Sequence, residues 1–368
     1  MTTAHSVSAA ANRVHANSKA TAEGPVPGVC APGDAVRSES RSSSSGRAGS
    51  VKKRARNRCI TLESPSLRIE IMPELGGGIA SFDWCDGDTP VPILRRCADP
   101  AAATDPNQLA CYPLLPFSNR VGGGSFQLEG RRVTVPRNRS DENLPIHGDG
   151  WLSRWQVESR EAGRIKLSLD RSGELPYAYR AAQTFTLDGA SLSITLEIEN
   201  TGDTTLPFGL GLHPFIERDS DTLVAAPANG LWLSGADWLS TEHVRTPPAW
   251  QFGVAYPLPE VLVNHGFTDW AGWMTAHWPE RQLMLTIQAD TRCFVLYTPP
   301  AQDWFCFEPV DHPINAMNLA GGAETHGMTL LAPGATLART FSLTVERTGE
   351  RSRPVGRQTF FSTQDDIQ

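Results

Sequence analysis

The sequence contains no run of about 18 apolar residues, which is the length that a membrane-spanning helix needs. The N-terminus also lacks the apolar segment of a secretory signal. No Cys-x-x-Cys spacing occurs, and the seven cysteines are an odd number. These absences argue against a membrane protein, a disulfide framework and a zinc ribbon. They predict reduced, mostly buried thiols in a cytoplasmic protein.

An excess of positive charge is also missing, because the formal net charge of −7 argues against a nucleic-acid surface. The average hides an asymmetry, since residues 1–58 carry ten Lys/Arg and three acidic residues and leave −14 for the remainder. This segment is rich in Ser and Arg and has a basic run at 52–56. We predict a disordered extension or an upstream start codon, and the basic run is either a solvated linker or a localisation patch.

No segment of a dozen residues has a helical period, and apolar residues instead alternate with polar ones, which is typical of half-buried strands. The most regular case is a predicted hairpin, in which Phe185 and Leu187 precede an Asp188-Gly189 turn and four alternating apolar residues follow at 192–198. We therefore predict an all-β protein. Residues 59–347 would form one large antiparallel β-sandwich, and residues 348–368 a polar tail.

Two segments that are well separated in the chain each supply half of an acid–base pair. His213 ends an apolar segment and precedes a proline, which favours a strand end there because proline cannot donate a ladder hydrogen bond. Glu308 lies in the apolar run 304–309, where a carboxylate is costly to bury unless it is paired or functional. Histidine exchanges protons near neutral pH, and desolvation would raise the pKa of the carboxyl group. The structural alternatives are a hydrogen-bonded core histidine and a glutamate that alternates outward into solvent.

Two further polar segments precede this pair in the chain. Arg120 presents a fixed fork of donors suited to vicinal hydroxyls, and its neighbour Asn119 adds a donor and an acceptor. His147 lies beside a glycine, and Trp151 offers an aromatic face of the kind that stacks on sugar C–H surfaces. The set predicts a site for a neutral, hydroxyl-rich ligand. A surface arginine and core tryptophans are the alternatives.

Metal-binding spacings are missing as well. The chain has no His-x-x-x-His, and no carboxylate triad lies near His147 or His213 in the sequence. We therefore expect no metal and no other cofactor.

With these segments in order, the chain resembles the aldose 1-epimerase (galactose mutarotase-like) family over most of residues 60–347. The resemblance rests on four segments in the family's order: CYPLLPFSNR at 111–120, IHG at 146–148 with Trp151 and Trp155 behind it, GLHPF at 211–215 and FEPV at 307–310. It implies the β-supersandwich fold with an open sugar cleft. It also implies that His213 is the general acid, that Glu308 is the general base, and that Arg120 and His147 bind the substrate.

The chain departs from the family pattern at one contact. Asn264 stands where the family usually has an aspartate, and Asp269 is the alternative for that role. Asparagine can still hydrogen-bond a hydroxyl, but it carries no charge. The departure leaves the sugar preference open, and the basic extension is also foreign to the family pattern.

The resemblance implies an isomerase that interconverts the α and β anomers of a hexose such as glucose or galactose. One rival is a hexose-6-phosphate mutarotase, for which the pairs Arg95-Arg96 and Arg131-Arg132 could supply cations. The other is a non-catalytic carbohydrate-binding protein on the same fold. A glycosidase would need two carboxylates across the bond. We expect a sugar as the only partner, no nucleic acid and no membrane, and a monomer or weak dimer.

Overall fold

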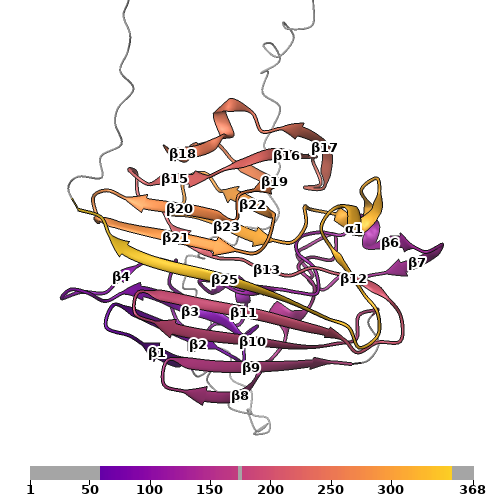
Figure 1. Ribbon diagram of the computed structural model, residues 1–368, viewed down its shortest axis with the longest axis horizontal. Coiled ribbons are helices and arrows are strands. Elements are labelled where there is room, and N and C mark those ends of the chain that lie inside the picture. Colours follow the sequence, from indigo (N-terminus) through magenta and orange to yellow (C-terminus); the bar gives the residue numbers. More distant parts are fainter. Residues whose placement is uncertain (1–58, 173–175, 350–368) are drawn as a thin grey trace, which may run out of the picture. The chain divides into compact units, whose positions relative to one another are not determined.

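The computed structural model describes residues 59–172 and 176–349, which are built almost entirely from strands (Figure 1). The extension expected at 1–58, and all but two residues of the tail expected at 348–368, lie outside the described residues. The helical elements within the described part are short: η1 (Pro106–Gln108), η2 (Gly122–Gly124), η3 (Gly150–Leu152), η4 (Pro248–Trp250), η5 (Ala316–Asn318) and α1 (Gly322–Thr325). No helix of that part is long and apolar enough to cross a membrane.

One large sheet has nine strands, and each neighbouring pair is antiparallel. Its order is β18 (Phe252–Pro257), β15 (Leu223–Ala226), β20 (Trp273–Trp278), β21 (Leu283–Ala289), β25 (Thr336–Arg347), β11 (Ser191–Asn200), β10 (Tyr179–Asp188), β9 (Arg164–Arg171) and β8 (Gln156–Glu161). Figure 1 shows the long β25, in yellow, between β21 and β11. The last long strand of the chain therefore joins two halves of the sheet that lie earlier in the sequence.

The second large sheet has eight strands and is again antiparallel. Its order is β17 (Ser240–Arg245), β16 (Ala228–Ser234), β19 (Val263–Trp270), β22 (Cys293–Thr298), β23 (Trp304–Val310), β13 (Gly211–Leu212) and β5 (Pro113–Leu114), and β14 (Phe215–Glu217) also pairs with β23. Strand β23 thus pairs with β22, which precedes it directly in the chain, and with β13 and β14, which lie far earlier in the sequence.

The remaining strands of the described residues form three smaller sheets. They are β1 (Ile60–Glu63), β2 (Leu67–Met72), β3 (Gly78–Trp84) and β4 (Val91–Pro92) in one sheet, β6 (Ser125–Leu128) with β7 (Arg131–Thr134), and β12 (Leu206–Phe208) with β24 (Thr329–Leu331). The turn between β6 and β7 consists of Glu129 and Gly130, both with positive φ, which is the geometry of a tight two-residue hairpin.

One apolar core joins the two large sheets. It combines side chains of the nine-stranded sheet, such as Leu285 and Phe341, with an aromatic stack from the eight-stranded sheet. In that stack the ring centroids of Phe267 and Phe294 are 4.6 Å apart, and those of Phe294 and Phe307 are 4.4 Å apart. Because period-two strands bury alternate residues, each sheet contributes one face to this core. The predicted all-β antiparallel sandwich is confirmed.

The opposite face of the eight-stranded sheet carries a second, smaller cluster of buried residues, which includes Tyr112, Phe215 and Cys306. Strand β23 therefore serves both layers, with Phe305 and Phe307 in the large core and Cys306 and Glu308 on the other face. Both faces are covered, so every residue of β23 is buried. The functional side chains lie on this second face.

Candidate active site

Strand register brings His213 and Glu308 together. Gly211 of β13 lies opposite Val310 of β23 in an antiparallel pair, and Phe215 of β14 lies opposite Cys306. The same register places His213 directly opposite Glu308. Cross-strand neighbours in such a position have Cβ atoms about 5 Å apart, so their side chains must meet on one face of the sheet.

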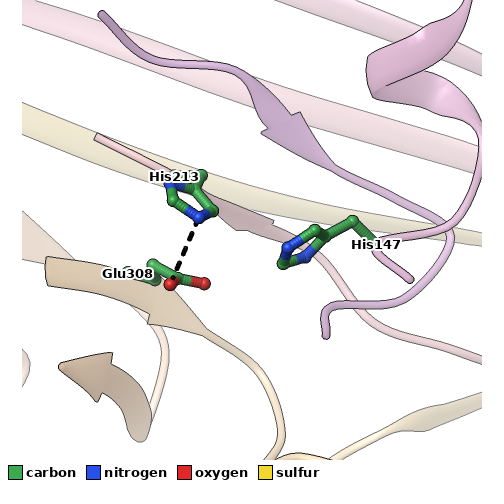
Figure 2. A group of neighbouring side chains, drawn as sticks. All are labelled: His147, His213 and Glu308. Atoms are coloured by element: carbon green, nitrogen blue, oxygen red, sulfur yellow. Dashed lines mark ion pairs between the residues drawn. The ribbon is translucent and has the colours of Figure 1, made fainter. Parts of the chain in front are cut away.

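The two side chains do meet. Nε2 of His213 lies 3.4 Å from Oε1 of Glu308, and Figure 2 shows the dashed contact with His147 beside it. The Glu308 side chain is 3% exposed, which excludes the solvated, outward orientation that strand alternation alone allowed. Among the described residues, His213 Nδ1 and Glu308 Oε2 have no hydrogen-bond partner. Unpaired buried polar atoms are rare, and a ligand hydroxyl would satisfy them.

A column of stacked rings fixes the orientation of the His213 imidazole. The ring lies between Tyr112, with centroids 4.6 Å apart, and Phe215, with centroids 4.7 Å apart, and both pairs are close to parallel. Trp151 stacks on the far side of Tyr112, and the Arg95 guanidinium lies 3.8 Å from the Phe215 centroid. The backbone N–H of His213 also donates to the Tyr112 carbonyl, so ring and backbone are both held.

Burial changes the pKa values of both members of the pair. Desolvation raises the pKa of Glu308 to about 8, against the opposing effect of the Arg120 charge. Desolvation also lowers the pKa of His213 to about 3, and the Arg95 charge acts in the same direction. Both shifts favour the uncharged forms. The free protein therefore keeps a single proton on the pair between these two values, and burial places it on Glu308.

His147 is held in one tautomer by the segment around Asn119. The backbone N–H of Asn119 donates to His147 Nδ1 over 3.0 Å, and the backbone N–H of His147 donates to the Asn119 carbonyl over 2.9 Å. Because Nδ1 accepts a hydrogen bond, the proton of the neutral ring must lie on Nε2. Burial lowers the pKa of His147 well below its usual value, so the ring is a neutral donor through Nε2.

This tautomer also bears on metal binding. His147, His213 and Glu308 offer ligand atoms within 4.8 Å of one another, a spacing that could hold an ion. A histidine that ligates through Nε2 needs its proton on Nδ1, where it normally donates to a second group. In this site the N–H of Asn119 points at Nδ1 and opposes that arrangement. The donor set therefore does not fit a resident metal.

The turn that carries His147 depends on the glycine after it. Gly148 has φ +66, and a Cβ at this position would lie 2.2 Å from the Leu115 carbonyl oxygen. We expect Gly148→Ala to lower the free energy of unfolding by about 3 kcal/mol, because backbone strain and a clash with backbone add together. Chemical denaturation followed by far-UV circular dichroism measures the change.

Gly130→Ala is the matched control for this prediction, since Gly130 has φ +76 but an added Cβ there meets nothing within 4 Å. It isolates the backbone cost, which is about 1 kcal/mol. Equal losses in the two variants would show that the contact with Leu115 is not limiting.

Two other predicted site residues, Arg120 and Asn264, lie outside the His213–Glu308 pair. The Arg120 side chain is 13% exposed and pairs with Glu142 through two hydrogen bonds. Asn264 lies opposite Tyr297, two residues along the strand from Gly266, which shares a cross-strand row with Val295 and Glu308. By the period of two it therefore faces the same side as Glu308.

Asp269 has positive φ and is exposed near the end of β19, where it lines a separate cavity with Arg292 and Asp290. Of the two candidates for the family aspartate, Asn264 therefore shares a face of the sheet with Glu308. Trp151 is 1% exposed, and its indole N–H donates to the Gly148 carbonyl. Trp151 is therefore buried against the His147 turn, which it supports, rather than exposed in a wall that a ligand could contact.

Four residues that matter for this geometry were not assigned these roles from sequence: Tyr112, Phe215, Glu142 and Arg95. The first two lie within the quoted segments at 111–120 and 211–215, next to recognised polar residues, so their proximity in sequence was the available signal. Arg95 was considered only as a phosphate-binding cation. Glu142 lies in a polar loop segment without a distinguishing pattern, so no local signal pointed to it.

The large antiparallel sandwich is the fold that solved galactose mutarotase-like proteins share with this chain. Comparison with known proteins agrees, because a family model for aldose 1-epimerases matches residues 58–344. The chain belongs to the aldose 1-epimerase family, whose members act on sugars.

Individual relatives support the same assignment. The uncharacterised protein YphB of Escherichia coli K12 is 33% identical over 297 residues, which cover 78% of this chain and 98% of YphB. A solved structure of a candidate aldose 1-epimerase from E. coli K12 shares 31% identity at a TM-score of 0.73, over 79% of this chain and 99% of that one. A galactose 1-epimerase from Lactobacillus acidophilus has a TM-score of 0.65 at 17% identity, covers 79% and 95% of the two chains, and shows the shared fold.

Proposed function

We propose that this protein is an aldose 1-epimerase that interconverts the α and β anomers of a free hexose such as glucose or galactose. The observation that carries the proposal is the buried cross-strand pair of His213 and Glu308, 3.4 Å apart. Anomer exchange needs one group that removes the proton from the C1 hydroxyl and one that protonates the ring oxygen. A pair that shares one proton supplies both.

In the proposed reaction Glu308 accepts the proton of the C1 hydroxyl while His213 donates a proton to the ring oxygen. The C1–O5 bond breaks and an open-chain aldehyde forms. Rotation about C1–C2 presents the other face of the carbonyl, and closure with the reverse proton transfers gives the other anomer. Each positioned acid or base contributes a factor of about 10²–10⁴.

This assignment requires the proton to pass from Glu308 to His213 before the ring opens. The pair is neutral overall in both forms, so the transfer brings no net charge into the buried site. The rings of Tyr112 and Phe215 on either side of His213 favour its cationic form. Ring opening then returns the proton to Glu308, and the burial that disfavours charge stabilises the pair at that stage.

The groups around the pair would hold the sugar. His147 donates through Nε2, and Arg120 and Asn264 offer further donors from neighbouring elements. Asn119 also holds His147 through its backbone, and its side chain remains a predicted contact for a sugar hydroxyl. Fixing C1 and the ring oxygen against the pair is the contribution expected from these contacts.

The rival that uses hexose 6-phosphates has less support. Arg95 stacks on Phe215 and donates to the Leu109 carbonyl, and Arg96 pairs with Asp83 over 2.7 Å. Arg131 and Arg132 are exposed on the small β6–β7 hairpin. The rival that binds sugar without catalysis does not require a buried histidine and carboxyl group that share one proton.

The pH profile tests the shared proton. We expect kcat/KM for mutarotation to be level through neutral pH and to fall above about pH 8, where the pair loses its proton and with it the acid. The acid limb lies near pH 3, where a second proton removes the base. Stopped-flow polarimetry from pH 5 to 10 measures the profile. A decline that begins near pH 6.5, the usual pKa of histidine, would contradict the shared-proton arrangement.

Polarimetry of freshly dissolved α-D-glucose and α-D-galactose tests the function itself. Acceleration over the buffer rate with either sugar supports the proposal. No acceleration with either sugar, in protein that binds neither, would overturn it and favour phosphorylated or rarer sugars.

A further inference from the structure

The Arg120 guanidinium is held by a carboxylate outside the acid–base pair. Its Nε donates to Glu142 Oε2 over 3.1 Å and its Nη2 donates to Oε1 over 2.8 Å. Both side chains are mostly buried, 13% and 17% exposed, so solvent screens the pair only partly. This two-point contact takes the Nε/Nη2 edge, one of the two edges with which a guanidinium binds a carboxylate or phosphate, and Glu142 also compensates the charge of Arg120.

The positive charge of Arg120 reaches the centre of the site. It opposes the rise that burial causes in the pKa of Glu308 and of Tyr297, and it adds to the lowering of the pKa of His147. An isolated bridge pairs Arg120 with Ile146, the neighbour of His147, so the arginine lies next to the group that would bind the sugar. A charge that Glu142 compensates attracts an anion less than a free one would.

Two other arginines near the site also have interaction partners. Arg139, which also acts on the pKa of His147, hydrogen-bonds to both Asp105 and Asp141. Arg95, which acts on the pKa of His213, lies over the Phe215 ring and donates to main-chain carbonyls. Among the described residues, the cations that act on the pair or on His147 are Arg120, Arg139 and Arg95. Each of them is paired with a carboxylate or stacked on a ring. With Arg120 and Arg139 paired to carboxylates and Arg95 stacked on Phe215, these three residues offer an anionic ligand no free guanidinium.

We propose that Glu142 is a specificity-determining residue, which occupies an anion-binding edge of Arg120 and thereby reserves the cleft for uncharged aldoses. The inference deepens the proposed function and rests on it. Sugars that bear a carboxylate or a phosphate are rejected, because they would enter beside the Glu142 carboxylate without a free guanidinium. Neutral hydroxyls need only the remaining N–H groups of Arg120.

The test compares two substrates that differ in charge, α-D-galactose and freshly dissolved D-galacturonate, at pH 7. Stopped-flow polarimetry gives kcat/KM for each, and the ratio of galacturonate to galactose is the readout. We expect Glu142→Gln to raise this ratio at least about tenfold over wild type, because the freed guanidinium can then bind the carboxylate. The gain should shrink with added salt. A damaged fold would lower both rates and would not produce this gain.

Two variants serve as controls. Glu142→Asp keeps the charge and should keep the wild-type ratio. Glu199→Gln removes a carboxylate that pairs with Arg180 over 3.0 Å on the nine-stranded sheet, so it makes the same change in net charge away from the cleft. It should also leave the ratio unchanged.

Different experimental results would contradict the role of Glu142 and the proposed function. An unchanged ratio in Glu142→Gln, with galactose still turned over, would overturn the role of Glu142 alone. A wild type that prefers galacturonate would overturn it as well. A wild type that accelerates neither sugar would instead overturn the mutarotase assignment.

Discussion

Replacing Glu308 by glutamine is expected to lower kcat for mutarotation by about 10²–10⁴-fold while sugar binding persists. The amide has the shape of the protonated carboxyl group but can neither accept nor return the C1 proton. Because burial raises the pKa of Glu308 to about 8, the wild-type side chain is mostly uncharged at pH 7, and the neutral substitute fits the same surroundings. Polarimetric initial rates, with binding followed by ligand-observed NMR, measure both effects.

A second carboxylate controls for the loss of an acidic group. Glu217 of β14 is partly buried and pairs with Arg281 over 3.6 Å, and β14 lies next to β23. Glu217→Gln should therefore retain turnover within a few fold of wild type. Normal activity in Glu308→Gln would remove Glu308 from the mechanism.

His213→Asn is expected to reduce kcat by a similar factor, because the ring oxygen loses its proton donor and the partner carboxyl group loses the group with which it shares a proton. The double variant with Glu308→Gln should be little worse than either single variant, since groups that act as a unit give non-additive losses. The same polarimetric assay compares the four proteins.

His277→Asn is the matched control for this histidine. His277 is also mostly buried, and its Nε2 hydrogen-bonds to Thr348 from the nine-stranded sheet. Its replacement should leave kcat near the wild-type value. Losses in the single variants that multiply in the double variant would mean that His213 and Glu308 act in separate steps.

Local patterning was sufficient for the sandwich. The alternation of Leu192, Ile194, Leu196 and Ile198 reappears as the buried face of β11, and the adjacent β10 pairs with it over ten residues. Such strands bury only one face, so the alternation of apolar and polar residues is enough to predict where they lie in the sequence. The order of strands within the sheets, including β25 between β21 and β11, depends on long-range pairing that no local segment specifies.

The candidate site, too, could be predicted from the sequence only in part. His213 and Glu308 could be selected from sequence because each is a polar residue in an apolar run, but the orientation of Glu308 could not be decided there. A strand that is covered on both faces has no polar side, so alternation does not distinguish inward from outward residues. Glu142 could not be found at all, because its partner Arg120 is 22 residues away in the chain and both lie in irregular segments.

Strand β23 places two different constraints on alternate positions of one segment. The volume of the large core limits which side chains fit in place of Phe305 and Phe307. The chemistry of the site limits which side chains can replace Cys306 and Glu308. Insertion or deletion of a single residue there would exchange the two sets at once, so this strand can diverge only by substitution and only within each set. The loops that carry Arg120, Glu142 and His147 have no such double role. New sugar preferences are therefore free to evolve in those loops while the proton-transfer pair and the core stay tied to one another.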